Sequence, residues 1–249
     1  MLVNSAVCYV LNMRFVGALA AFTCAFLAAS APAQEPDPFA DLHQRAREVE
    51  RSLVTLRADF VETTESDLLV EPIIESGKMI AARPIRVLLR YEKPEKKLLL
   101  IDGDQLLMVW PERAQSERMP IAKIQQTADK YFYEASEKEL QGHFIIHVTS
   151  DPELPGTRRV EMIAKRKQIQ EGLERLELWV EDRTLYMVKM RLVYPGGAGT
   201  KTIELFNLIA NVPVEDEEFR VELPSETSDR PRGFHTRAVP VTRTPFRPQ

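Results

Sequence analysis

The sequence predicts a single α+β domain built on one highly curved antiparallel sheet, with a few helices on one face. Three observations lead to this prediction. An amphipathic helical segment comes first, a long series of segments with period-two alternation follows, and turn residues rather than a linker separate those segments. The chain has 249 residues, of which 44% are hydrophobic and 28% charged, so wholesale disorder and a polytopic membrane protein are excluded. A net charge of −4 argues against general affinity for nucleic acid.

Residues 1–33 are predicted to be a signal peptide. The apolar run at 15–29 follows the positive charge of Arg14, and Ala31 and Ala33 form a small-residue cleavage site of the signal-peptidase type. We therefore expect export and cleavage after Ala33. The alternative is an uncleaved membrane anchor, because about 20 apolar residues can span a bilayer.

The two cysteines, Cys8 and Cys24, both lie within this predicted signal peptide. Its removal would leave a mature chain with neither disulfides nor a thiol nucleophile. Thr23 before Cys24 does not suit lipidation of that cysteine. The first 12 residues carry no charge, so both Met1 and Met13 remain possible starts.

The first element of the mature chain is expected to be an amphipathic helix. Its apolar residues recur at spacings of three, four and seven and form one stripe, made of Phe39, Leu42, Ala46, Val49, Leu53 and Leu56. The remaining face is polar, which predicts one wet side and one side covering a hydrophobic surface.

The strands are expected in two groups with a helical interlude between them. The period-two segments of the first group lie at 57–64, 68–82, 85–91, 97–101 and 105–110. Asp102-Gly103 predicts a hairpin turn within this group, because Asp-Gly tolerates positive φ. Helical spacing at 121–131 and a capping box from Ser136 to Glu139 form the interlude. The second group is expected at 143–149, 159–164, 173–180, 185–194, 201–209 and 219–223.

We expect one domain over 34–224 and a flexible basic Pro/Arg-rich tail over 225–249. The tail is expected to be inert, with binding to acidic lipid headgroups as the alternative.

No arrangement of residues suited to bond making is recognisable. His143 and His147 suggest a metal site, but on a strand the two positions would lie about 13 Å apart, so no metal site is expected. A nucleophile elbow and a phosphate-binding loop are both missing from the sequence. We therefore expect neither an enzyme nor a bound cofactor.

Apolar side chains on both faces of several strands are the unusual feature of the sequence. Residues 98–101 are all aliphatic, and 106–110 are apolar throughout. A sheet with one solvated face alternates apolar and polar residues, so these strands need cover on both faces. Two explanations stay open, namely an ordinary core with helix packing and a hydrophobic cavity between sheet and helices that accepts an apolar ligand.

Residues 77–115 contain a G…RP…P…DG…P…Q pattern, at Gly77, Arg83-Pro84, Pro94, Asp102-Gly103, Pro111 and Gln115. In this pattern, and in the weaker segments 56–60, 176–194 and 211–224, the chain resembles the periplasmic outer-membrane lipoprotein carrier (LolA) family. The resemblance implies an unclosed antiparallel β-barrel of about 10–11 strands, with helices covering a hydrophobic cavity.

The resemblance also implies a function and partners. Such proteins work in the periplasm, take acylated lipoproteins from an inner-membrane ABC-type exporter and pass them to an outer-membrane acceptor, without a cofactor. We expect this chain to do so as a monomer.

Arg83 matches the family arginine that is tied by hydrogen bonds to the helical lid, which implies that it latches the lid. The alternative is that Arg83 only ends the second strand on the surface. Alternation along the strands predicts the side chains of the acyl cavity, which are Phe60, Leu89, Tyr91, Leu107, Val109, Trp179, Met190 and Phe206.

Two other functions stay open. One is a lipid- or lipoprotein-sensing periplasmic domain that regulates an envelope-stress signalling partner. Such sensors usually have a second C-terminal domain, whereas only irregular residues follow Pro224, which favours the carrier. The other is a hydrolase of an envelope ester, for which no nucleophile arrangement is recognisable.

Overall fold

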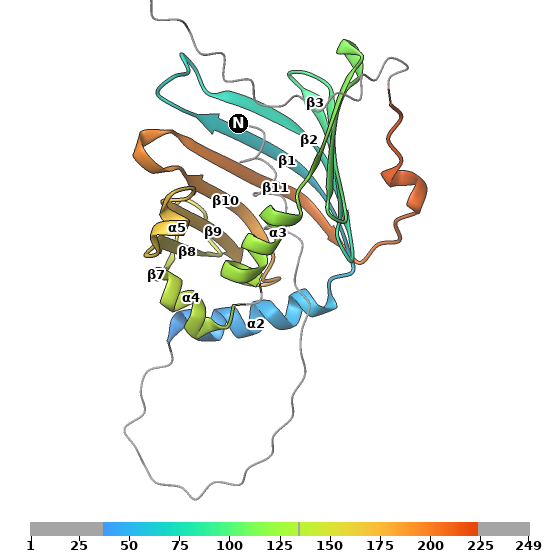
Figure 1. The fold of residues 1–249 in the computed structure, drawn as a ribbon. Coiled ribbons are helices and arrows are strands. Elements are labelled where there is room, and N and C mark those ends of the chain that lie inside the picture. Colours follow the sequence, from blue (N-terminus) through green and yellow to red (C-terminus); the bar gives the residue numbers. More distant parts are fainter. Residues whose placement is uncertain (1–36, 134, 224–249) are drawn as a thin grey trace, which may run out of the picture.

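Eleven strands form one antiparallel sheet that does not close (Figure 1). The computed structural model describes residues 37–133 and 135–223, so the predicted signal peptide, both cysteines and the predicted tail lie outside the described residues. The strand order is β6-β5-β4-β3-β2-β1-β11-β10-β9-β8-β7. The strands are β1 (Thr55–Glu65), β2 (Ile73–Ala82), β3 (Arg86–Lys93), β4 (Lys97–Asp102), β5 (Gln105–Trp110), β6 (Gln115–Pro120), β7 (Phe144–Ser150), β8 (Thr157–Ala164), β9 (Arg175–Glu181), β10 (Met187–Val193) and β11 (Thr200–Ala210).

This order joins two antiparallel meanders through the pairing of β1 with β11. The predicted α+β class with an unclosed, highly curved sheet is therefore confirmed. The turn at Asp102-Gly103 is also confirmed, since Gly103 has a φ of +57° between β4 and β5.

Among the described residues, one helix precedes the sheet, most of the others lie between the two meanders, and a short one connects β8 with β9. They are α2 (Pro38–Ser52), α3 (Ala122–Ala128), a π-helical turn (Asp129–Tyr133), α4 (Glu137–His143) and α5 (Lys167–Gln170). Asp37 begins α2 by accepting a hydrogen bond from the amide of Phe39 at 2.9 Å. Ser136 and Glu139 form the predicted capping box of α4. In Figure 1, α2 and α4 lie together at one end of the curved sheet.

Three sequence predictions need correction. The predicted helix ends at Ser52, and Leu56 already belongs to β1. Strand β6 was not expected, because Gln115–Pro120 is mostly polar and only two of its six residues are even partly buried. The strand predicted at 219–223 is wrong, since Asp216–Phe219 forms a 3₁₀ turn and 220–223 has no regular structure.

The main hydrophobic core lies on the concave face of the sheet, where α2, α3 and α4 pack. A second, smaller core lies on the convex face, where the C-terminal segment (residues 212–223) covers β2 and β3. Its buried members are Ile80, Leu88 and Phe219, with Leu100, Val214 and Val221 packed against them. The apolar residues on both faces of these strands are thus explained in part by an extended segment rather than by a second layer of helices.

Ion pairs and hydrogen bonds fasten the C-terminal segment to the convex face. Arg57 donates to the Glu218 carboxylate at 2.7 Å, and Arg90 donates to the main-chain oxygen of Glu218 at 2.7 Å. The Arg86 guanidinium lies 4.2 Å from the centre of the Phe219 ring.

Candidate functional site

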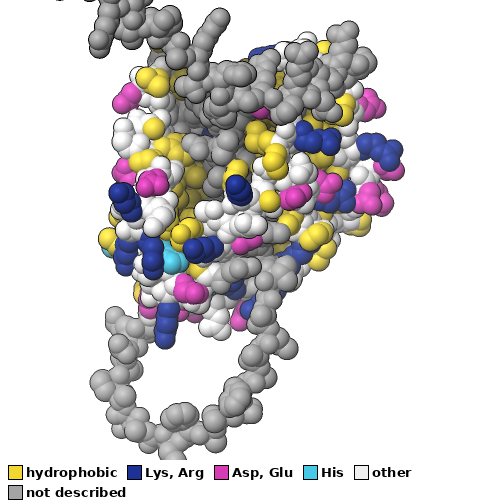
Figure 2. Space-filling model, viewed as in Figure 1, with side chains coloured by type: hydrophobic (Ala, Val, Ile, Leu, Met, Phe, Trp, Pro, Cys, Tyr) yellow, Lys and Arg dark blue, Asp and Glu magenta, His cyan; other side chains and the backbone are white. Residues whose placement is uncertain are grey.

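A cavity of about 230 Å³ lies between α2 and the concave face of the sheet. On the side of the molecule shown in Figure 2, hydrophobic side chains lie inside a recess and charged side chains surround it. Apart from His43, Arg47, Glu50 and the phenol of Tyr186, the side chains that line the cavity are apolar. These apolar residues are Phe39, Leu42, Ala46, Val49, Leu53, Leu56, Met79, Ala81, Phe132, Leu140, Val160, Met162, Leu176, Leu178, Val180, Leu185, Met187, Leu205 and Leu208.

Helix α2 forms one wall of this cavity with its apolar stripe. All six stripe residues recognised in the sequence, from Phe39 to Leu56, line the cavity. The stripe is not fully covered by the sheet, since only Phe39 and Leu42 are buried within α2. An amphipathic helix whose apolar side faces a cavity can exchange contacts with the sheet for contacts with a ligand.

Hydrogen bonds hold α2 at both ends. At its start, the Gln141 amide of α4 donates to the Asp37 carboxylate at 2.6 Å. At its end, Arg83 donates from Nε to the carbonyl of Leu53 and from Nη2 to the carbonyl of Glu50, each at 2.5 Å. The Arg83 amide donates to the Val54 carbonyl at 3.0 Å. The Arg83 side chain therefore adds a second donor to the Glu50 carbonyl, which also accepts from the Leu53 amide, and supplies a donor to the carbonyl of the C-cap residue Leu53.

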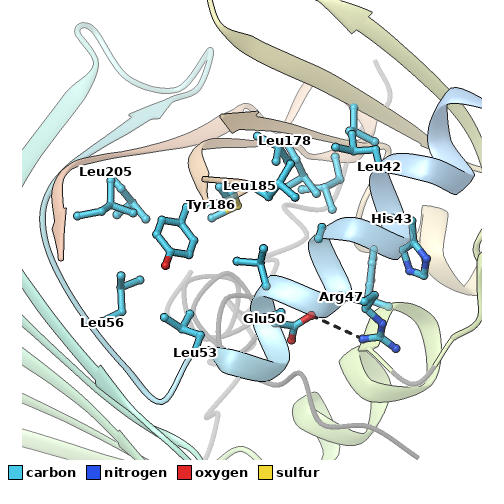
Figure 3. A pocket seen from close by; sticks show the side chains of 18 of the residues that line it. Leu42, His43, Arg47, Glu50, Leu53, Leu56, Leu178, Leu185, Tyr186 and Leu205 are labelled. Carbon is cyan, nitrogen blue, oxygen red and sulfur yellow. Dashed lines mark ion pairs between the residues drawn. The ribbon is translucent and has the colours of Figure 1, made fainter. Parts of the chain in front are cut away.

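The polar side chains of the α2 wall, His43, Arg47 and Glu50, follow one another along the helix (Figure 3). Oε2 of Glu50 lies 3.9 Å from Nη1 of Arg47, an ion pair drawn as a dashed line in the figure. Burial raises the pKa of Glu50 to about 8, even though Arg47, Arg83 and Arg51 act in the opposite direction. Burial, with a smaller contribution from Arg47, lowers the pKa of His43.

None of the eight side chains predicted for the acyl cavity is among its lining residues. Phe60, Leu89, Tyr91 and Met190 do face the concave side, but they are buried in the core beyond the cavity, each at most 4% exposed. Phe60 and Tyr91 pack edge to face, with ring centres 4.9 Å apart.

Tyr91 belongs to a buried polar cluster instead of a ligand wall. Its hydroxyl donates to Glu62 at 3.2 Å, and Lys201 forms an ion pair with the same carboxylate. Gly77 faces this part of β3 so closely that a Cβ there would lie 1.9 Å from the Arg90 carbonyl oxygen. The glycine of the sequence pattern is therefore required by close strand contact.

The other four predicted residues lie on the opposite face or outside. Met108 pairs with Leu99, which pairs with the concave-facing Leu89, so Met108 also faces the concave side. Its neighbours Leu107 and Val109 therefore point to the convex side, because successive side chains of a strand alternate between faces.

Trp179 lies between the lining residues Leu178 and Val180 and points away from them, donating its indole N–H to Asp151 at 2.5 Å. Phe206 is 44% exposed.

Besides the sheet wall, two further parts of the cavity were not indicated by the sequence. Phe132 and Leu140 of the helical interlude close one side of the cavity. Glu50 was read as part of the polar face of α2, although it lies three residues before Leu53 and therefore next to the stripe. Its position at the edge of the apolar stripe could have indicated that Glu50 lines the cavity.

Neither a candidate metal site nor a candidate membrane-spanning helix occurs in the described residues. Residues 37–133 and 135–223 contain no group of three or more His, Cys, Asp or Glu side chains placed to hold a metal ion. Over the same ranges, no helix has the length and apolar character that crossing a membrane requires.

Solved structures are similar to this chain at low sequence identity. MucB has a TM-score of 0.50 and 10% identity, with 76% of this chain and 65% of MucB covered. An uncharacterized conserved protein from Thermus thermophilus has a TM-score of 0.49 and 9% identity, with 75% and 96% covered. A LolA superfamily protein from Nitrosomonas europaea has a TM-score of 0.37 and 8% identity, with 73% and 96% covered.

Comparison with curated proteins finds no match. The family model for the outer membrane lipoprotein carrier protein LolA, in contrast, matches residues 51–222, which span the sheet from the end of α2 to the C-terminal segment. The unclosed eleven-stranded sheet, the helix across its concave face and this match together show that the chain belongs to the LolA family.

Proposed function

We propose that this chain is a periplasmic carrier that binds the acyl chains of lipoproteins in its cavity and shuttles them from the inner to the outer membrane. The observation that carries the proposal is the apolar cavity between α2 and the sheet, walled on one side by an amphipathic helix. Hydrocarbon transferred from water into such a site gains about 0.8 kcal/mol per buried CH₂ group.

Release of such a ligand requires that the cavity open. We propose that Arg83 latches α2 in the closed position, because its side chain donates to two main-chain carbonyls, those of Leu53 and Glu50. Hydrogen bonds from a charged donor contribute about 1.5–3 kcal/mol each, which is enough to hold a helix yet small enough to be overcome by cargo or a partner.

The partners of a carrier follow from this function. We propose that acylated lipoproteins are the cargo, an inner-membrane ABC-type exporter is the donor and an outer-membrane protein is the acceptor. Export through residues 1–33 and cleavage after Ala33 belong to the same proposal.

Native mass spectrometry of the full chain recovered from the periplasm tests the proposal. We expect a mature chain that begins at Gln34 and carries an acylated protein or lipid in stoichiometric, non-covalent association, lost on organic denaturation. A chain that is consistently empty, and that binds no apolar fluorescent probe when purified, would contradict the carrier function.

The second candidate is a lipid- or lipoprotein-sensing domain that regulates an envelope-stress signalling partner. The observation that supports it is the shared fold with MucB. A transfer assay separates the two, since only a carrier moves acylated protein from inner-membrane vesicles to outer-membrane vesicles in proportion to its concentration.

A further inference from the structure

The buried carboxyl group of Glu50 has no structural task that the fold explains. Its side chain is only 12% exposed, and it lines a cavity whose other walls are almost entirely aliphatic or aromatic. Within the described part of the chain, neither carboxyl oxygen of Glu50 takes part in a hydrogen bond. A polar group buried without a partner costs roughly 1–3 kcal/mol, so a purely structural residue at this position would be expected to be apolar.

The surroundings of Glu50 define the kind of group that would satisfy it. Burial raises the pKa of this carboxyl to about 8, so at neutral pH the protonated form, which presents an O–H donor to the cavity, is the more populated one, and the ion pair with Arg47 forms when the carboxyl ionises. The Arg47 guanidinium, 3.9 Å away, adds positive charge beside it. Donors beside an apolar volume favour a ligand with a hydrocarbon chain and an acceptor oxygen, and Arg47 disfavours a chain that ends in a cation.

We infer that Glu50, with Arg47 beside it, is the polar recognition point of the cavity and hydrogen-bonds the carbonyl oxygen of an acyl ester or amide whose chain fills the apolar part. The inference rests on the proposed carrier function and specifies which group of the cargo the cavity binds, the acyl carbonyl. In Figure 3, Glu50 and Arg47 lie on α2 at one side of the cavity, with leucine side chains and Tyr186 facing it from the other elements. The bound carbonyl would therefore lie next to the end of α2 that Arg83 holds.

The test compares two lipids that differ only in the carbonyl, monopalmitoylglycerol and its ether analogue hexadecylglycerol. Binding is measured by displacement of N-phenylnaphthylamine fluorescence from the full chain at neutral pH. We expect the wild-type chain to bind the ester about 3- to 10-fold more tightly than the ether, the effect of one hydrogen bond. Palmitate is included as a free anion, and tighter binding of palmitate than of the ester would overturn the assignment.

Two variants of Glu50 test whether a hydrogen-bond donor at this position causes the preference for the ester. Glu50→Gln keeps a donor and an acceptor and should retain the preference for the ester. Glu50→Leu should bind both lipids but with equal affinity, because the donor at position 50 is removed. Glu48→Leu is the matched control, since Glu48 is exposed on the same helix, and it should behave as wild type.

The possible failures are distinguishable. If the wild-type chain binds neither lipid, the carrier function itself fails. If it binds both with equal affinity, or if Glu50→Leu keeps the preference, the carbonyl assignment is overturned while the carrier function stands.

A pH series on the wild-type chain gives a second measurement that needs no variant to fold. Raising the pH from about 6 to 9 ionises Glu50 and removes its donor, so the preference for the ester should disappear. The other charged or titratable groups beside Glu50 or in the cavity are His43, Arg47 and Arg51 of α2, with Arg83 and Tyr186. A preference unchanged across this range would overturn the assignment.

Discussion

At the scale of the residue, Arg83 connects the sheet to the helix that covers the cavity. Its planar guanidinium donates to two carbonyls, that of Glu50 in the last turn of α2 and that of Leu53 just after the helix. A lysine ammonium could not reproduce this geometry. We expect Arg83→Leu to leave the sheet folded, because the Arg83 amide keeps its bond to the Val54 carbonyl. Loss of both side-chain bonds, about 3–6 kcal/mol, should raise the open population of α2 by at least about 100-fold.

Hydrogen exchange measures this directly, as faster exchange of the α2 amides with unchanged protection in the sheet. Delivery of acylated cargo to outer-membrane vesicles should be impaired in the same variant. Arg51→Leu removes an equal charge from an exposed position of α2 and serves as the control. Equal α2 exchange and equal delivery in wild type and Arg83→Leu would remove the latch role.

At the scale of the element, the C-terminal segment stabilises the fold without forming a strand. Phe219 is 5% exposed and packs with Ile80 and Leu88 on the face opposite the cavity. We expect Phe219→Ala to lower the free energy of unfolding by about 3 kcal/mol through lost burial and a residual cavity. Binding of an apolar probe should not change, because the ligand cavity lies on the concave face.

Chemical denaturation and probe titration of the same variant give both results. Leu223→Ala is the matched control, since Leu223 is 46% exposed and its truncation should change stability by less than about 0.5 kcal/mol. A large loss of probe binding in Phe219→Ala would show that the two faces of the sheet are coupled.

At the scale of the whole molecule, one buried carboxyl group makes stability depend on pH. Folded chains keep the Glu50 proton up to a pH of about 8, the raised pKa, whereas unfolded chains release it near the ordinary value of 4.5. The free energy of unfolding contributed by this group is therefore highest below pH 4.5, falls as the pH rises to about 8 and is constant above.

Glu50→Gln should remove this dependence, so its stability relative to wild type should increase between pH 5 and pH 8 by at least about 1 kcal/mol, or ~2–4 °C in Tm. The difference between variant and wild type isolates Glu50, because His43 and His143, whose lowered pKa values act in the opposite sense, are common to both. Thermal melts across this range measure it. Parallel curves for the two proteins would show that Glu50 ionises in the folded state as it does in the unfolded chain.

The local pattern of the sequence determined most of the elements. Alternation located ten of the eleven strands, the Asp102-Gly103 turn followed from the conformational tolerance of glycine, and the capping box at Ser136 marked the start of α4. The stripe from Phe39 to Leu56 indicated a helix facing a hydrophobic surface. Each of these signals is local, because it depends on the geometry of a few consecutive residues.

Only the tertiary structure decided which face of each strand meets the cavity. Alternation separates Leu107 from Met108 and Leu178 from Trp179, but it does not say which member of a pair points inward, since that depends on strand register and on what covers each face. Here α2 covers one face and the C-terminal segment covers part of the other. The sequence by itself thus determined a curved sheet with an amphipathic helix, while long-range packing decided where the cavity lies and placed Glu50 within it.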